Sequence, residues 1–321
     1  MFPRSSTELH ALDEISGLDL SALTIFTRYR GHPQLSHSDH QSLFRHELVS
    51  AVEIGGVCTT LSNEHGVIAA CAIKPLGWDS QHFGLPMARL SLAASPACPP
   101  TALGGFLRDT FHVAKQKIPS LHVSCEVDID DYPCLNALID LGAEILDVKR
   151  EYRWTSLKGI KPPKFLTRVR DYRPEDKPAV MQLLDKVHFE SRFSRDPQLD
   201  QQKAADLYRL WLGKLLDAPE SDRIALVMER DGRVQACGAI EKQDLGCAGV
   251  AIQLMNNGIY LSSPAATGSY YPIIYTLAER SLIHFSSVQT CVSLNNHAAS
   301  RVLEKMGVGA ESSRYALRLY H

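Results

Sequence analysis

The chain of 321 residues is 45% hydrophobic and 22% charged, which is an ordinary globular composition and predicts two domains rather than one. Its formal net charge of −2 at pH 7 excludes a strongly basic protein, so we expect no nucleic-acid partner. No stretch approaches the roughly 18 apolar residues of a membrane span, and the first residues lack the apolar core of a signal peptide, so we expect a cytoplasmic protein without a membrane partner.

Residues 57–154 carry a series of predicted elements, whereas residues 1–50 show no clear periodicity. The series is a hairpin, a strand, a helix, a strand, a helix and a strand, assigned from the spacing of hydrophobic residues. The predicted elements span residues 57–78, 87–94, 101–118, 120–127, 132–145 and 148–154.

The segment SLKGIKPPKF, residues 156–165, is the strongest linker signal in the sequence. Its two prolines, one glycine and three lysines interrupt the periodic patterns around it. We therefore place a domain boundary there and predict domains at residues 1–157 and 166–321.

The second domain begins with a strand and two helices and then repeats the order of the first. A hairpin that turns at Asp231-Gly232 is followed by a strand, a helix, a strand, a helix and a final strand. The predicted elements span residues 165–176, 177–189, 200–216, 224–241, 249–263, 269–285, 288–294, 296–307 and 312–321. We interpret the shared order as internal duplication of one fold.

The stretch SSPAATGSYYPIIYTLAERSLIHF, residues 262–285, combines a strand end, a loop of small residues and a helix. The first N–H groups of a helix have no intrahelical partner, and the helix dipole adds partial positive charge, so such a junction can bind a phosphate. The loop has one glycine, Gly268, and no Arg or Lys. It is therefore either a modified phosphate site or an ordinary strand-to-helix connection.

The second domain resembles the GNAT superfamily of N-acetyltransferases in two motifs. The hexamer SPAATG matches the loop pattern Q/R-x-x-G-x-G/A at Gly268, while Ala266 stands at the first glycine and Ser263 at the Gln or Arg. The run NNHAASRVLEKMGV is similar to a later family pattern that contains a tyrosine, and Leu303 occupies the tyrosine position. The positions of this run that match are Asn296, Ala299, Lys305 and Gly307.

This resemblance implies an α/β fold of two GNAT-like domains, each a mixed, mostly antiparallel sheet flanked by helices. It also implies an acyl-CoA-dependent N-acyltransferase that uses acetyl-CoA or another acyl-CoA as co-substrate. The strand before the loop would bind pantetheine through its main chain, and free amides at residues 265–270 would hold the pyrophosphate. The implied binding residues are Tyr260, Leu261, Ser263, Ala265, Ala266, Thr267, Gly268, Ser269, Tyr270 and Asn296.

The catalytic residues that we expect are Glu241, Tyr315 and Asn296. Glu241, at the end of a strand, is a candidate base, and His188 is another. Leu303 cannot donate a proton, so the general acid is sought among Tyr270, Tyr271 and Tyr315. Each has a structural alternative: a solvated strand-end charge for Glu241, a half-buried strand aromatic for Tyr315 and a helix N-cap for Asn296.

The first domain has a narrower resemblance. Its stretch LGWDSQHFGLPMARL is similar to the W-D-S-x-F-F-G signature of bacterial TDP-fucosamine acetyltransferases, and His82 departs from it. The segment HFESRFSRDP resembles the start of the second domain in these enzymes. The acceptor implied is a small amine, such as an amino sugar linked to a nucleotide, bound by a monomer or homodimer. The substrate-binding residues implied are Trp78, Asp79, His188 and Arg192, with a tight turn and ordinary loop charges as alternatives.

The first domain's own strand-to-helix loop, SPACPPTALGG, has prolines where backbone N–H donors would be needed. We expect this domain to bind no CoA and to form support and a substrate wall. We also expect no metal, because only His37 and His40 have H-x-x-H spacing and no cysteine lies near them. None of the eight cysteines forms a C-x-x-C pair, so we expect reduced, mostly buried thiols.

Two other functions remain open. The first is a GNAT-fold binding or regulatory module without catalysis, which Ala266, Leu303 and the absence of basic loop residues favour. The second is a transferase that uses aminoacyl-tRNA as donor, against which the nearly neutral charge argues.

Overall fold

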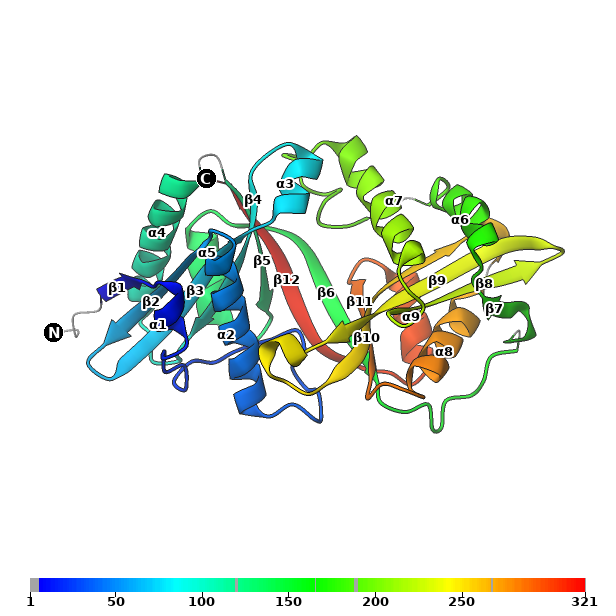
Figure 1. Cartoon of the computed structure of the whole chain (residues 1–321), viewed down its shortest axis with the longest axis horizontal. Coiled ribbons are helices and arrows are strands. Elements are labelled where there is room, and N and C mark those ends of the chain that lie inside the picture. The colour runs from blue at the N-terminus through cyan, green and yellow to red at the C-terminus, as the bar shows by residue number, and fades with distance from the viewer. Residues whose placement is uncertain (1–5, 119–120, 165, 188–189, 267, 321) are drawn as a thin grey trace. The chain divides into compact units, whose positions relative to one another are not determined.

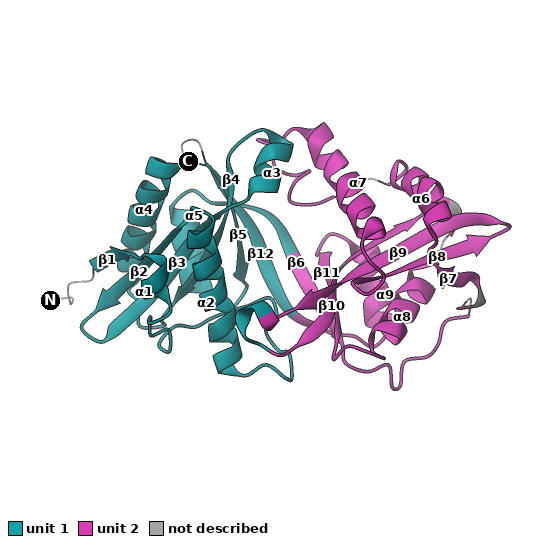
Figure 2. Cartoon of the chain, viewed as in Figure 1, with its two compact units in different colours: residues 1–148, 247–250, 312–321 teal, residues 149–246, 251–311 magenta. Residues whose placement is uncertain are grey.

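The structure is a computed structural model, and it describes residues 6–118, 121–164, 166–187, 190–266 and 268–320 (Figure 1). The chain forms two compact units (Figure 2). Unit 1 comprises residues 1–148, 247–250 and 312–321, and unit 2 comprises residues 149–246 and 251–311. Among the described residues, no helix is both long enough and apolar enough to cross a membrane.

Unit 1 is a mixed sheet with helices on both faces. Its strands are β1 (Ser6–Leu9), β2 (Val57–Asn63), β3 (Gly66–Pro75), β4 (Met87–Ala94), β5 (His122–Asp128) and most of β12 (Ala310–Tyr320). Neighbours pair in this order, antiparallel except for the parallel β4–β5 pair. The helices are α1 (Leu12–Ile15), α2 (His37–Glu53), α3 (Gly77–Phe83), α4 (Pro100–Lys117) and α5 (Tyr132–Asp140).

Unit 2 has the same kind of sheet. Its strands are residues Lys149–Trp154 of β6 (Glu144–Trp154), then β11 (Val288–Ser293), β10 (Gln253–Ser262), β9 (Arg233–Asp244), β8 (Arg223–Arg230) and β7 (Val169–Asp171), paired in that order. Only the β10–β11 pair is parallel among them. The helices are α6 (Lys177–Leu184), α7 (Gln201–Asp217), α8 (Tyr270–Ser281) and α9 (His297–Lys305).

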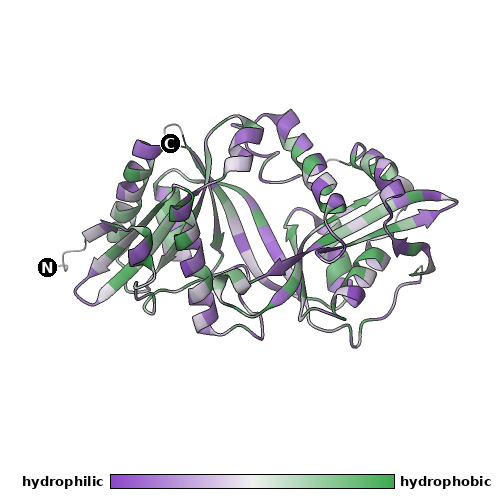
Figure 3. Cartoon of the chain, in the orientation of Figure 1, coloured by the Kyte–Doolittle hydropathy of each residue, from purple (hydrophilic) through white to green (hydrophobic). Residues whose placement is uncertain are grey.

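Each face of each sheet has its own hydrophobic core. In unit 1, Leu103 and Phe106 of α4 pack on one face, and Phe44 and Leu48 of α2 pack on the other. In unit 2, α8 and α9 cover one face, which we call the α8/α9 face, and α6 and α7 cover the other, the α6/α7 face. Figure 3 shows hydrophobic residues along the strands and alternating hydrophobic and hydrophilic stretches along α4 and α7, as burial of one helix side requires.

The elements after residue 56 lie close to their predicted positions, but the two units are not the two halves of the chain. The predicted boundary lay at residues 158–165, whereas unit 1 ends at residue 148 and regains residues 312–321. The reason is strand pairing. Lys149–Trp154 of β6 pair with β11 in unit 2, and Arg314–Tyr320 of β12 pair with β5 in unit 1. Helix α2 was not predicted from the sequence, and α6 ends before its predicted end.

Candidate functional site

Strands β10 and β11 of unit 2 separate soon after they meet. Met255 of β10 pairs with Val288 of β11, and this is the one register pair of the two strands among the described residues. Beyond Met255, β10 continues to Ser262 on β9, while β11 continues on β6. Alternate peptide groups of a strand point away from its neighbour. The β10 segment Ile259–Ser262 therefore presents backbone donors and acceptors on the side that β11 leaves.

A β-bulge accompanies this separation. Asn256 pairs with Glu241 and Ile259 with Ala239, so three steps along β10 correspond to two along β9. One extra residue in a strand bends it and increases its twist. The bulge lies directly after Met255, at Asn257-Gly258, so it turns β10 away from β11 where their pairing ends.

The corresponding strands of unit 1 stay together for longer. Four register pairs, from Met87–His122 to Leu90–Cys125, join β4 to β5. Helix α4 follows with Pro99 at its N-cap and Pro100 at its first position. Proline has no N–H to offer a phosphate. Residues 91–93 of β4 then continue on β3 without a register pair on β5, so unit 1 differs from unit 2 in the length of this pairing and in the prolines at its helix start.

The loop between β10 and α8 is partly closed by its own hydrogen bonds. The Ala266 N–H donates to the Ser263 carbonyl at 3.0 Å, and the Ser269 N–H donates to the Ala266 carbonyl at 3.0 Å. The expectation that all amides of residues 265–270 are free is therefore wrong at two positions. Gly268 has φ +89°, a left-handed conformation that suits glycine, and a Cβ there would meet nothing within 4 Å. Thr267 lies outside the described residues.

Ser263, directly after β10, is bound to the neighbouring strand β9. Its N–H donates to the Gln235 carbonyl at 2.8 Å, and its hydroxyl donates to the Gln235 side-chain oxygen at 2.6 Å. The predicted pantetheine residue Leu261 has a buried side chain in the core of the α6/α7 face. Only its main chain is left for a ligand, as the sequence analysis proposed.

Two tyrosines pack at the N-terminus of α8. The rings of Tyr260 and Tyr270 meet edge to face with centroids 4.6 Å apart. The Ser269 hydroxyl donates to the Ala266 carbonyl at 2.6 Å, so the Tyr260 hydroxyl, 2.6 Å from Ser269 Oγ, is the donor in that contact. Burial raises the pKa of both phenols, and Tyr152 and Tyr260 raise that of Tyr270 further. These phenols stay protonated at neutral pH.

Polar side chains gather on the α6/α7 face where the strands part. Met255 and Val288 belong to the core of the α8/α9 face, so the next residues, Asn256 and Gln289, point to the opposite face. Both are buried, with 3% and 0% exposed. Asn256 Nδ2 donates to Gln243 at 3.0 Å. Glu241, the predicted base, is half-buried on β9 opposite Asn256.

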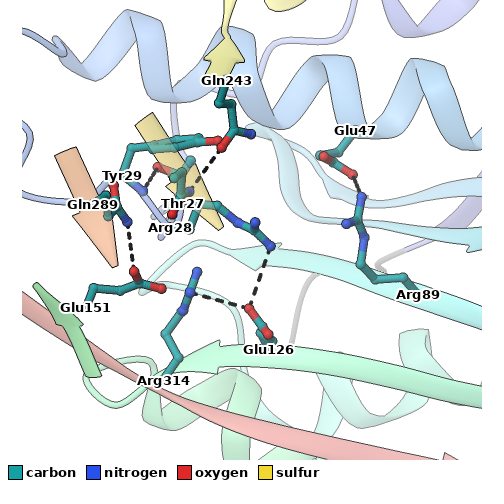
Figure 4. Close-up of polar contacts among 11 residues, drawn as sticks. Thr27, Arg28, Tyr29, Glu47, Arg89, Glu126, Glu151, Gln243, Gln289 and Arg314 are labelled. Carbon is teal, nitrogen blue, oxygen red and sulfur yellow. Dashed lines mark hydrogen bonds and ion pairs between the residues drawn. The ribbon is translucent and has the colours of Figure 1, made fainter. Parts of the chain in front are cut away.

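Glu151 of β6 is a second carboxylate on this face. Figure 4 shows Gln289 directed at Glu151, and Gln289 Nε2 donates to Glu151 Oε2 at 2.9 Å. Arg153 lies two residues along, forms an ion pair with Glu311 and reaches Gln289 Oε1 at 3.5 Å. Burial raises the pKa of Glu311, although Arg153 partly opposes this. Sequence analysis missed Glu151 because it assigned the strand to the first domain.

Comparison with known proteins rests on structure alone, because no protein-family profile and no curated protein sequence match the chain. A GCN5-related N-acetyltransferase from Sphaerobacter thermophilus aligns over 98% of this chain and 95% of its own, with 11% identity and a TM-score of 0.55. A tandem GNAT protein from the clavulanic acid biosynthesis pathway aligns over 99% and 98%, with 14% identity and a TM-score of 0.50.

The chain has the GNAT fold. The predicted fold class is confirmed by these similarities and by the mixed sheets of both units. At these identities the likeness establishes the fold and not the activity or substrate.

The α9 residues that resemble a GNAT motif make structural contacts within unit 2. The Asn296 side chain accepts from the Ala299 N–H at 3.1 Å and is the N-cap of α9, as its structural alternative stated. Ala299 and Leu303 are buried in the core of the α8/α9 face, and Gly307 has φ +76° just after the helix. The position of the GNAT tyrosine is thus filled by an aliphatic side chain that cannot donate a proton.

Tyr315 is placed in unit 1. It pairs with Val127 of β5 and packs against the core beneath α4, so its side chain belongs to unit 1 and not to the unit that contains β10 and β11. Unit 1 has its own polar cluster on β5 and β12, where Arg28 and Arg314 lie 3.9 Å and 3.5 Å from Glu126 (Figure 4). Nearby, Arg89 forms an ion pair with Glu47.

The W-D-S stretch forms α3 of unit 1. The Ser80 hydroxyl accepts from the Met87 N–H at 2.9 Å and donates to the Leu76 carbonyl at 2.7 Å, which ties α3 to β4. Phe83 is buried, and Gly84 ends the helix at φ +74°. Trp78 remains 51% exposed.

The other predicted substrate residues lie on both units. Trp78 stacks on His82 with ring centroids 5.1 Å apart. Asp79 is half-buried. In unit 2, Arg192 lies over the ring of its neighbour Phe193 at 4.8 Å. His188 lies outside the described residues.

Proposed function

We propose that the protein is an acyl-CoA-dependent N-acyltransferase whose donor site lies in unit 2. One observation carries the proposal: the separation of β10 from β11 beyond the Met255–Val288 pair, beside the N-terminus of α8. This geometry offers an extended ligand a row of backbone groups and offers its anionic end a helix N-terminus. The GNAT fold supports the same function.

An acyl-CoA at this site would supply an acyl group activated as a thioester. The main chain of Ile259, Tyr260 and Leu261 would bind the pantetheine arm, in the manner of an added strand. The α8 N-terminus and the amides of Gly268 and Tyr270 would face the pyrophosphate, because two other amides of the loop are engaged internally. The open strand edge fits the donor well, and the loop fits it with fewer amide donors than were expected.

The acceptor would be an amine that reaches the split from the α6/α7 face. On the α8/α9 face Met255 and Val288 are apolar, whereas the opposite face carries the carboxylates of Glu241 and Glu151. An amine must lose a proton to form an amide, and a positioned carboxylate that accepts it typically accelerates the reaction by roughly 10²–10⁴-fold. We propose Glu241 as this base.

Within amines, we propose an amino sugar linked to a nucleotide as acceptor class. Two observations support it. The W-D-S stretch is similar to that of sugar-nucleotide acetyltransferases, and Trp78 keeps a large exposed aromatic surface on which a ring can stack. The structure explains Ser80, Phe83 and Gly84 by local contacts but gives Trp78 no core role, which suits a ligand contact.

Isothermal titration of the full chain with acetyl-CoA tests the donor site, and thiol release with nucleotide-linked amino sugars as acceptors tests the transfer. We expect saturable acetyl-CoA binding at micromolar to low millimolar concentration and acceptor-dependent release of CoA. Absence of binding at millimolar acetyl-CoA would overturn the proposal. Binding without transfer to any amine would support the alternative of a non-catalytic GNAT-fold module, which the closed amides and Leu303 favour.

A further inference from the structure

We infer that Tyr152 of β6 donates a proton to the sulfur of CoA as general acid. Leu303, which occupies the tyrosine position of the GNAT pattern, has no hydroxyl for this role. The inference rests on the proposed function, since it assigns a proton donor to that donor site. It concerns a residue from the first half of the chain, which no motif of the second domain contains.

The Tyr152 hydroxyl is an unexplained buried polar group. The side chain is 0% exposed, and its hydroxyl oxygen has no hydrogen-bond partner among the described residues. Buried hydroxyls almost always have a partner, because an unmade hydrogen bond is costly in the interior. A ligand atom that enters the site and accepts this hydrogen bond would account for the hydroxyl.

Tyr152 also lies on the strand that pairs with β11, and its side chain is on the same face of the sheet as Leu303. In the antiparallel ladder of β6 with β11, Trp154 pairs with Val288 and Tyr152 with Thr290, so Tyr152 is two residues along β11 from the point of separation. Its side chain belongs to the core of the α8/α9 face, which also contains Leu303. Tyr152 of β6 therefore lies in the same hydrophobic core as Leu303 of α9, the position that corresponds to the GNAT tyrosine.

Other phenols of unit 2 are already used or less suited. The Tyr260 hydroxyl donates to Ser269, and the Tyr271 hydroxyl donates to the Lys161 carbonyl. Tyr270 is close enough to Tyr152 for the two phenols to interact electrostatically, and it is the strongest rival. Tyr152 differs from it in being fully buried, so that a hydroxyl without a partner is costly there.

The amine nitrogen attacks the thioester carbonyl, the C–N bond forms and the C–S bond breaks with its electron pair leaving on sulfur. The amine loses one proton to the carboxylate base, and sulfur takes one proton from the Tyr152 phenol. The products are an amide and the CoA thiol, and transfer of the base's proton to the phenolate, through water, restores both groups.

The test compares CoA with desulfo-CoA in calorimetric titrations of the full chain at about pH 9, where part of the CoA thiol is thiolate. A phenol donates a charge-assisted hydrogen bond to a thiolate. We expect Tyr152→Phe to lower the affinity for CoA about tenfold, the loss of one such bond, and to leave the affinity for desulfo-CoA unchanged. Tyr275→Phe, which removes a hydroxyl from α8 in the same core, is the matched control and should change neither affinity.

Equal CoA affinity of wild type and Tyr152→Phe would overturn the inference, as would a sulfur-specific loss in Tyr270→Phe instead. Failure of the wild type to bind CoA would overturn the proposed function itself, and it is seen before any variant is made. The melting temperature gives a second measurement. Because the Tyr152 hydroxyl has no partner, we expect Tyr152→Phe to melt no lower than the wild type. A lowered melting temperature would show a structural hydrogen bond and would contradict the inference.

Discussion

Gly238 of β9 lies directly opposite Tyr260 of β10, and a Cβ at Gly238 would stand 2.3 Å from Ile273 Cγ2 of α8. The missing side chain lets α8 lie close against the strand pair whose free edge forms the candidate donor site. The same close packing sets the N-terminus of α8 beside Tyr260, where the Tyr260 hydroxyl donates to Ser269. The position of α8 relative to the free edge of β10 therefore depends on the absence of a side chain at Gly238.

Gly238→Ala should destabilise the protein. The added methyl also meets Leu277 Cδ1 at 3.2 Å, and Ile273 is β-branched and fully buried, so it has little freedom to move. We expect a loss of about 1–3 kcal/mol in the free energy of unfolding, the usual cost of overpacking, measured by urea denaturation. Gly213→Ala, in the interior of α7 where a Cβ meets nothing within 4 Å, is the control. It should stabilise the helix by up to about 1 kcal/mol, and equal effects of the two changes would contradict this account.

Gly268→Ala should weaken acyl-CoA binding beyond its effect on stability. Gly268 has φ +89°, and Gly307, at the end of α9, has φ +76°, so alanine at either costs about 1–2 kcal/mol of backbone strain. Only Gly268 belongs to the proposed phosphate loop. In titrations with acetyl-CoA we expect Gly268→Ala to lose about fivefold or more in affinity, roughly 1 kcal/mol, and Gly307→Ala to bind as the wild type. Matching affinities in the two variants would remove Gly268 from the proposed site.

Asp176 should contribute stability that depends on pH. Its carboxylate accepts from two nitrogens of Arg170 at 2.7 and 2.9 Å and from the Arg173 N–H at 2.8 Å. The Arg170 hydrogen bonds lower its pKa from the ordinary 3.8. Because the folded-state pKa is depressed, the stabilisation is present above about pH 4 and is lost as the pH falls through the folded-state pKa.

Asp176→Asn should therefore lower the free energy of unfolding by about 1.5–3 kcal/mol at neutral pH, the value of hydrogen bonds to a charged group. The difference in this free energy between variant and wild type should become smaller below about pH 4. Urea denaturation across this range measures it. The control is Asp217→Asn, which breaks the ion pair with Lys177. Because the Asp217 side chain is 63% exposed, we expect this change to lower the free energy of unfolding by under about 1 kcal/mol. If the difference in unfolding free energy between Asp176→Asn and wild type stayed constant below pH 4, the pH-dependent role of Asp176 would be contradicted.

Most elements could be predicted because their signals are local. Hydrophobic alternation predicted β4 at its observed bounds, and Asp231-Gly232 predicted the turn between β8 and β9, where Asp231 has φ +53°. The N-terminal helix α2 went unpredicted because its hydrophobic side is weakly marked in the sequence. The short helix α3 went unpredicted because its Ser80 contacts depend on β4, seven residues away.

The candidate site could be predicted only in part. The loop, Gly268 and the α9 motif were found because GNAT motifs are contiguous in sequence. Glu151 and Tyr152 were missed because neither lies in such a motif and their relation to Gln289 and Leu303 depends on non-local packing. Asn296 was found, but its side chain caps α9.

The amino-acid sequence by itself determined the local structure of this protein: the strands, most helices, the glycine turns and the strand–loop–helix junction, all of which depend on residues near one another in the chain. Tertiary structure alone decided which strands pair. It put Lys149–Trp154 beside β11 and Arg314–Tyr320 beside β5, and it ended the β10–β11 pairing at Met255. Pairing is a matter of backbone hydrogen bonds between distant segments, and those bonds are nearly independent of side-chain identity, so residue patterns carry little record of them.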